Sequence, residues 1–123
     1  PTAAAPAGSG ELRPLHERLA AAEGLDVELA LRNVGGRPPV LRRVLETFVQ
    51  KYRDGPGVLD GRSAHSLRGA CATVGATRLQ AALVDYENGI AAGADAAALR
   101  HRADRIVAEL QALTALLKAE LAR

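Results

Sequence analysis

The stretch Ser63-Ala-His-Ser-Leu-Arg-Gly-Ala-Cys-Ala-Thr-Val-Gly75 decides how this chain folds and where its chemistry lies. On a helix of about 3.6 residues per turn, Leu67, Cys71 and Val74 form one apolar stripe. His65 lies off this stripe. Its own face carries one positive charge and almost no bulk, in Gly61, Arg68, Gly69 and Ala72. The stretch therefore predicts a helix that buries one face and presents an imidazole on another.

Gly69 strengthens a functional interpretation of His65, one turn earlier on the same face. A glycine inside a helix costs about 0.5–1 kcal/mol relative to alanine, so the missing side chain needs a reason. A large partner that approaches the imidazole is one reason, and close packing against another helix is the other. An ordinary exposed histidine is the alternative to a functional one.

The composition favours one all-helical domain. A chain of 123 residues is long enough for a single domain with a modest core. Apolar residues make up 48% of the chain and aromatic residues 2%, which predicts an aliphatic, alanine-rich core of close-packed helices. The 16 basic and 14 acidic residues nearly balance, so nucleic-acid binding has little support. The lone Cys71 cannot form an internal disulfide and indicates a reducing compartment, the cytoplasm. No apolar run approaches the roughly 18 residues that a membrane span needs.

Caps, glycines and apolar spacing divide the chain into short helices. Residues 1–10 carry no charge and no bulky apolar group, which is typical of an interdomain linker, and residues 11–123 form the domain. The expected helices cover residues 11–23, 27–34, 38–53, 61–75, 76–92 and the segment after Asp95. Either Asp60 or Ser63 caps the fourth; with Ser63 as the cap, His65 would lie in the first turn. Short connections predict an up-down-up-down four-helix bundle with one or two short extra N-terminal helices.

The sequence lacks the residue spacing that a zinc site, a nucleophile elbow or a phosphate-binding loop requires. His16 and His101 lie away from the apolar stripes and are predicted to be surface residues. His65 has no histidine, cysteine or carboxylate three or four residues away, so a zinc site is not expected. No nucleophile elbow and no phosphate-binding glycine loop occurs. The chain lacks an initiating methionine, which is expected for a piece of a longer protein.

The motif His65-Ser-Leu-Arg-Gly, followed by Gly75 and Leu79, resembles the histidine-containing phosphotransfer domain, usually His-x-Leu-Lys-Gly with the same later glycine. The resemblance extends over residues 25–92, and Tyr86-Glu87 stands where a Leu-Glu pair is common. Arg68 replaces the family's lysine and keeps the charge. Phe48 and His65 are only 17 positions apart, which is short for the family.

The resemblance implies a phosphocarrier of a His-Asp phosphorelay within a hybrid sensor kinase, not an enzyme in its own right. His65 would accept a phosphoryl group from a receiver-domain aspartate, and Arg68 would balance its charge. Partner docking is expected on Gly61, Arg62, Gly69 and Ala72. The domain would need no cofactor or metal, because the receiver brings Mg²⁺. The alternative is a helical bundle of the same kind that only binds a partner, which the short segment before His65 favours.

Overall fold

The computed structural model describes residues 13–123 of the chain. Within this range all regular secondary structure is helical, which confirms the all-α prediction. The expected linker, residues 1–10, lies outside the described residues. The six helices are α2 (Leu15–Leu19), α3 (Val27–Asn33), α4 (Pro38–Tyr52), α5 (Gly61–Val74), α6 (Thr77–Ala91) and α7 (Ala96–Leu121).

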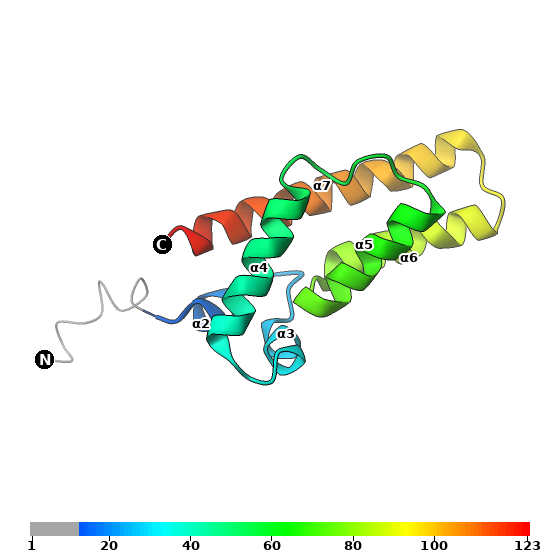
Figure 1. Ribbon diagram of the computed structural model, residues 1–123. Helices are drawn as coiled ribbons and strands as arrows, with labels where there is room; N and C mark the ends of the chain where they lie inside the picture. Colours follow the sequence, from blue (N-terminus) through cyan, green and yellow to red (C-terminus); the bar gives the residue numbers. More distant parts are fainter. Residues whose placement is uncertain (1–12) are drawn as a thin grey trace, which may run out of the picture.

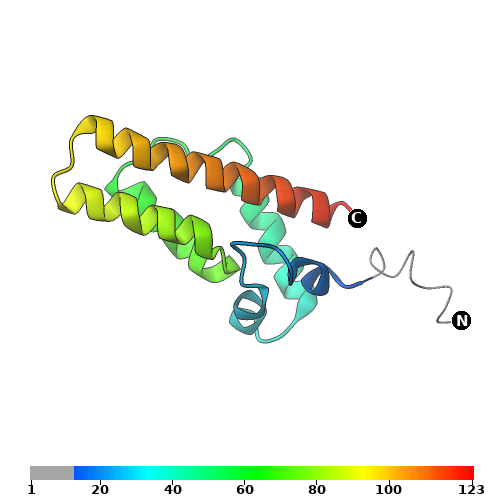
Figure 2. The ribbon, with the colours of Figure 1, turned by 180° about the vertical axis from the view of Figure 1, so that it is seen from behind.

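Helices α5, α6 and α7 lie side by side and alternate in direction, as Figures 1 and 2 both show. Helix α6 lies between the other two and packs against each of them. Helix α4 crosses α7 steeply and packs mainly on it, with a smaller contact to α5 (Figure 1). The short helices α2 and α3 close one end of the molecule, beside the start of α4. None of the described helices is both long and apolar enough to cross a membrane.

The core is aliphatic, as the composition predicts. Six leucines lie at its centre with none or 1% of their surface exposed, and each contributes about 1.5–3 kcal/mol through burial. They are Leu19, Leu41, Leu45, Leu83, Leu110 and Leu117. One aromatic pair, Phe48 and Tyr52 at the end of α4, packs with ring centroids 5.0 Å apart. Every buried residue of the described chain is apolar or glycine, so the chemistry of the molecule lies on its surface.

The first helix is shorter than predicted. A helix over residues 11–23 was expected, but α2 contains only five residues. Pro14 disfavours helical backbone in the residue before it and serves as the N-cap, so no helix extends back through this position. The chain then leaves the helix through tight turns to Gly24, whose φ is +79°. Arg18 ties this short element to the end of α7, because its guanidinium donates to the Glu120 carboxylate at 2.9 Å and carbonyl at 2.8 Å.

The remaining helix boundaries agree with the predictions to within one or two residues. Asp26 caps α3 and Asp95 caps α7, each by accepting a hydrogen bond from a backbone N–H. Pro38 and Pro39 occupy the first turn of α4. Ile90, near the end of α6, continues the apolar spacing of Leu79, Leu83 and Tyr86, which predicts burial, but it is 39% exposed. The helix is about to end there, and no neighbouring element covers its outer side.

Gly75 joins the end of α5 to the start of α3. Its φ of +73° ends the helix in the left-handed conformation that glycine tolerates best. A β-carbon at this position would collide with the carbonyl oxygen of Asp26. The backbone N–H of Asp26 also donates to the carbonyl of Gly75 at 2.7 Å. The C-terminal end of α5 is therefore held in place by a close contact between backbones.

Candidate functional site

Helix α5 presents His65 from a well-defined N-terminus. Asp60 is the N-cap: its carboxylate accepts from the Ser63 N–H at 2.8 Å, and the Ser63 hydroxyl accepts from the Asp60 N–H at 2.9 Å. This capping box satisfies two of the free N–H groups, and the bond from Ser63 lowers the pKa of Asp60. Asp60 is thus the cap, and His65 is the fifth residue of the helix, beyond the first turn.

The buried side of α5 fixes the direction in which His65 points. Leu67, Cys71 and Val74 are buried as predicted, and Ala64 joins them. The side chain of His65 remains 71% exposed. Burial raises the pKa of the Cys71 thiol to about 12, which keeps this residue protonated and unreactive in the core. The imidazole of His65 is therefore accessible to a partner, whereas the thiol of the same helix is not.

Two charged side chains lie against the imidazole. Arg68, one turn further along α5, places its Nη2 atom 3.1 Å from His65 Nδ1. Glu87, on α6, places one carboxylate oxygen 2.6 Å from Arg68 Nε and the other 3.5 Å from His65 Nδ1. Glu87 is only 24% exposed and Arg68 36% exposed, so this ion pair is better shielded from solvent than most surface pairs. His65 thus stands at the exposed edge of a half-buried arginine–glutamate pair.

Glu87 is the site residue that helical periodicity does not reveal. Its 22-residue separation from His65 is bridged only by the packing of α6 against α5. The one signal in the sequence is the Tyr86-Glu87 pair noted in the family resemblance. Tyr86 contributes to the placement, because its hydroxyl donates to the carbonyl of Leu59 at 3.2 Å and links α6 to the loop before α5.

We call the exposed surface formed by Gly61, Arg62, His65, Gly69 and Ala72 the His65 face; all five residues are exposed. A β-carbon added at Gly69 would have no atom of a neighbouring element within 4 Å, so the glycine does not serve helix packing. A β-carbon at Gly61 would lie 3.9 Å from Ile90 Cδ1, an ordinary contact. The face is therefore open at Gly69, and the partly exposed side chain of Ile90 lies beside Gly61 at its edge.

The other histidines lie apart from this arrangement. His101 is exposed on α7, as predicted. His16 is half-buried rather than exposed, and its Nδ1 atom is buried without a hydrogen-bond partner among the described residues. Residues 13–123 contain no group of three or more histidine, cysteine, aspartate or glutamate side chains placed to hold a metal ion.

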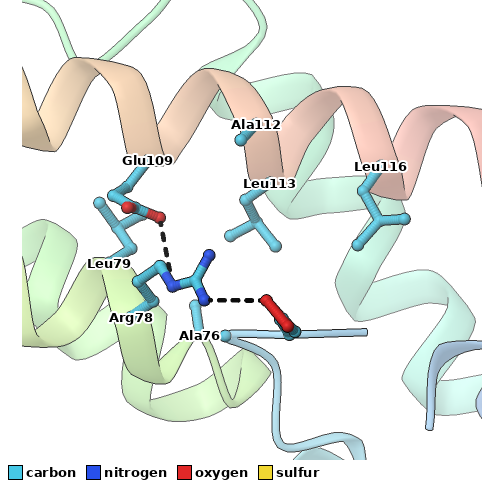
Figure 3. A pocket seen from close by; sticks show the side chains of 9 residues that line it. Ala76, Arg78, Leu79, Glu109, Ala112, Leu113 and Leu116 are labelled. Carbon is cyan, nitrogen blue, oxygen red and sulfur yellow. Dashed lines mark hydrogen bonds and ion pairs between the residues drawn. The ribbon is translucent and has the colours of Figure 1, made fainter. Parts of the chain in front are cut away.

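A hollow lies between α6, α7 and the turn before α3, and it contains no member of the His65 face (Figure 3). Arg78 occupies its mouth and pairs with Glu23 at 3.3 Å and with Glu109 at 3.9 Å. Leu79, Leu113 and Leu116 provide its apolar wall (Figure 3). The arginine already neutralises part of the acidic charge there, so the hollow is explained as a surface ion-pair cluster over the core.

The chemistry available at the His65 face is that of an accessible imidazole beside the guanidinium of Arg68. The cation suits an anionic group on the imidazole, because guanidinium binds phosphate and carboxylate oxygens through charge-assisted hydrogen bonds. Comparison with protein-family models, with curated proteins and with solved structures finds no match to this chain.

Proposed function

We propose that this chain is the phosphocarrier module of a His-Asp phosphorelay. His65 accepts a phosphoryl group from the aspartate of one receiver domain and passes it to the aspartate of a second. The observation that carries the proposal is an imidazole that is 71% exposed on a firmly buried helix, with Arg68 Nη2 3.1 Å from its ring. The resemblance of the His65 motif to histidine-containing phosphotransfer domains supports the same function.

In this proposal His65 Nε2 attacks the phosphorus atom of the acyl phosphate in line with the leaving carboxylate. The N–P bond forms as the P–O bond to the aspartate breaks, and the aspartate leaves with the electron pair. Arg68 balances the charge of the phosphoryl oxygens through donors that are already beside the ring. Gly69 and Ala72 leave space for the receiver's loops.

The proposed carrier is a four-helix bundle built from α4, α5, α6 and α7, with α2 and α3 as the additional N-terminal helices. Its partners are response-regulator receiver domains, which supply the Mg²⁺ that their own chemistry uses. A carrier of this kind transfers its group stoichiometrically and is not an enzyme. It would act in the cytoplasm, as a domain of a larger sensor kinase. Nucleic acid is not among its proposed partners, and the domain would not insert into a membrane.

The test of this proposal is phosphorylation of the chain by a receiver domain carrying phosphoaspartate. A phosphoramidate is labile in mild acid and stable in mild base, so the label should follow that pattern. His65→Gln should abolish labelling while circular dichroism shows an unchanged fold, since the side chain is exposed. His16→Gln and His101→Gln serve as matched controls and should be labelled like the parent. Labelling of His65→Gln at the parental level would contradict the proposal.

A bundle that only binds a partner is the second candidate. The short segment between Phe48 and His65, only 17 positions, favours it, because this segment is usually longer in the phosphotransfer family. The exposed Val58 in this segment, at 85% exposure, would then be part of a binding surface. Binding of a receiver without any labelling of His65, under conditions in which a known carrier is labelled, would select this second function.

A further inference from the structure

Two side chains compete for the Nδ1 atom of His65. Arg68 Nη2 lies 3.1 Å from Nδ1, and Glu87 Oε2 lies 3.5 Å from the same atom. A guanidinium can only donate a hydrogen bond, whereas an ionised carboxylate can only accept one. A hydrogen bond with Arg68 therefore requires Nδ1 without a hydrogen, whereas a hydrogen bond with Glu87 requires Nδ1 with one.

Each neighbour selects one tautomer of the neutral ring. When Arg68 donates to Nδ1, that nitrogen has no hydrogen, and the single ring proton lies on Nε2. When Nδ1–H donates to Glu87, the proton is on Nδ1 and the lone pair of Nε2 is free. In the structure Arg68 is the nearer partner, so the geometry corresponds to the first tautomer, in which Nε2 is not a nucleophile.

We infer that Arg68 and Glu87 form a tautomer switch that prepares His65 Nε2 for phosphoryl transfer, with Glu87 as the positioning residue. The inference rests on the proposed function and deepens it by assigning Glu87 a role. An incoming phosphoryl group attracts the guanidinium of Arg68 away from Nδ1. Glu87 then accepts the hydrogen bond from Nδ1–H, and Nε2 becomes the nucleophile.

The transfer step balances on this assignment. The exposed ring exchanges its proton with water, losing it from Nε2 and gaining one on Nδ1. Nε2 then uses its lone pair to form the N–P bond, while the P–O bond of the donor acyl phosphate breaks and its carboxylate leaves with the electron pair. The ring keeps the Nδ1 proton and becomes positively charged. The carboxylate of Glu87 offsets this charge, as Arg68 offsets that of the phosphoryl oxygens.

In the proposed switch the carboxylate of Glu87 keeps its position, and the guanidinium of Arg68 moves. Glu87 belongs to α6, which packs closely along α5, and only 24% of its side chain is exposed. The guanidinium of Arg68 is held by Glu87 at one edge, through Nε at 2.6 Å, and its Nη2 end reaches the imidazole. Rotation about the side-chain bonds of Arg68 moves Nη2 away from His65 Nδ1, and neither helix has to move for this.

The first test measures the tautomer of His65 in the unphosphorylated protein by ¹⁵N NMR of the ring nitrogens. Arg68→Ala should increase the Nδ1–H tautomer, because the competing donor is gone. Glu87→Ala should increase the Nε2–H tautomer, because the acceptor is gone. Glu109→Ala is the matched control: its side chain is 26% exposed and also pairs with an arginine, Arg78. Unchanged tautomer populations in both Arg68→Ala and Glu87→Ala would overturn the inference, even if His65 accepts phosphate normally.

The second test measures the rate of phosphorylation by a phosphorylated receiver. We expect Glu87→Ala to be slower by roughly tenfold to a hundredfold, less than the loss a wrong tautomer causes in a buried triad, because His65 exchanges protons with water. Glu87→Asp should transfer faster than Glu87→Ala but more slowly than the parent. The control Glu109→Ala should transfer at the parental rate. A parental rate in Glu87→Ala would overturn the switch. Absence of labelling in the parent would instead overturn the proposed function, while the NMR measurement still decides which neighbour controls Nδ1.

Discussion

Substitution of Gly69 best distinguishes the proposed phosphocarrier from a helical bundle that does not transfer phosphate. A side chain at this position should favour folding of the helix, whereas it should hinder docking of a receiver domain. Gly69 lies inside α5, where glycine is less favourable than alanine, and no neighbouring element contacts a β-carbon placed there. Replacement by alanine should therefore stabilise the isolated domain by about 0.5–1 kcal/mol. For a chain of this size that corresponds to a rise of about 2–6 °C in the melting temperature.

The longer side chain in Gly69→Gln tests docking. Four residues along a helix turn it by about 400°, so position 69 lies about 40° from His65 and one turn further along. Glutamine there should fold normally and melt no lower than the parent, since it is a good helix former with open space around it. Its side chain would occupy the His65 face, where a receiver must approach Nε2 to bonding distance. Transfer from a phosphorylated receiver should become at least about tenfold slower, because a misplacement of the reacting groups by about 1 Å can cost about a hundredfold in rate.

Thermal unfolding by circular dichroism and a timed transfer assay measure the two effects separately. Ala115→Gln is the matched control, because Ala115 is exposed on the C-terminal part of α7, a helix that contributes no residue to the His65 face. This variant should transfer at the parental rate. A lower melting temperature for Gly69→Ala would show that the glycine is needed for folding. A parental transfer rate for Gly69→Gln would show that receivers dock elsewhere.

Two further predictions concern stability and the core. The hydrogen bond from Arg18 lowers the pKa of Glu120 below its ordinary 4.5, so the ionised carboxylate stabilises the fold above that pH and the contribution is lost as the pH falls through the lowered value. Acid titration followed by circular dichroism should therefore show a smaller acid-induced loss of stability in Glu120→Gln than in the parent, and identical profiles would contradict this. Cys71, whose pKa burial raises to about 12, should react with iodoacetamide at pH 8 only when the domain unfolds. Alkylation at the rate of a free thiol without denaturant would contradict the buried placement.

The helices were predictable because local chemistry determines them. Asp26 and Asp95 belong to a residue type that favours the N-cap position, and both accept the backbone hydrogen bonds that caps accept. The stripe of Leu67, Cys71 and Val74 is buried as its spacing predicts. Between Asp60 and Ser63 the sequence alone could not choose, because both are good caps. The structure resolves this by using both, with Asp60 as the cap and Ser63 as its reciprocal partner.

The failed predictions involve neighbours outside the local pattern. The helix expected over 11–23 ignored the restriction that Pro14 places on the residue before it. Ile90 continues the apolar spacing of α6, yet it is 39% exposed, because the spacing does not tell how far a neighbouring helix extends. Glu87 is placed beside His65 by contact between α5 and α6, which no single-helix pattern contains.

These neighbours explain why an arginine suits position 68, where the family that the motif resembles usually has lysine. Lysine carries one ammonium group on a flexible stem, so it could contact either a carboxylate or an imidazole at a given moment. The guanidinium of Arg68 contacts Glu87 through Nε and reaches His65 Nδ1 through Nη2 at the same time. Arg68 therefore couples α6 to the imidazole, and a phosphoryl group that draws Nη2 away changes the hydrogen bonding of Glu87 as well. On this argument, the arrival of phosphate at His65 acts on two helices of the domain rather than on one side chain.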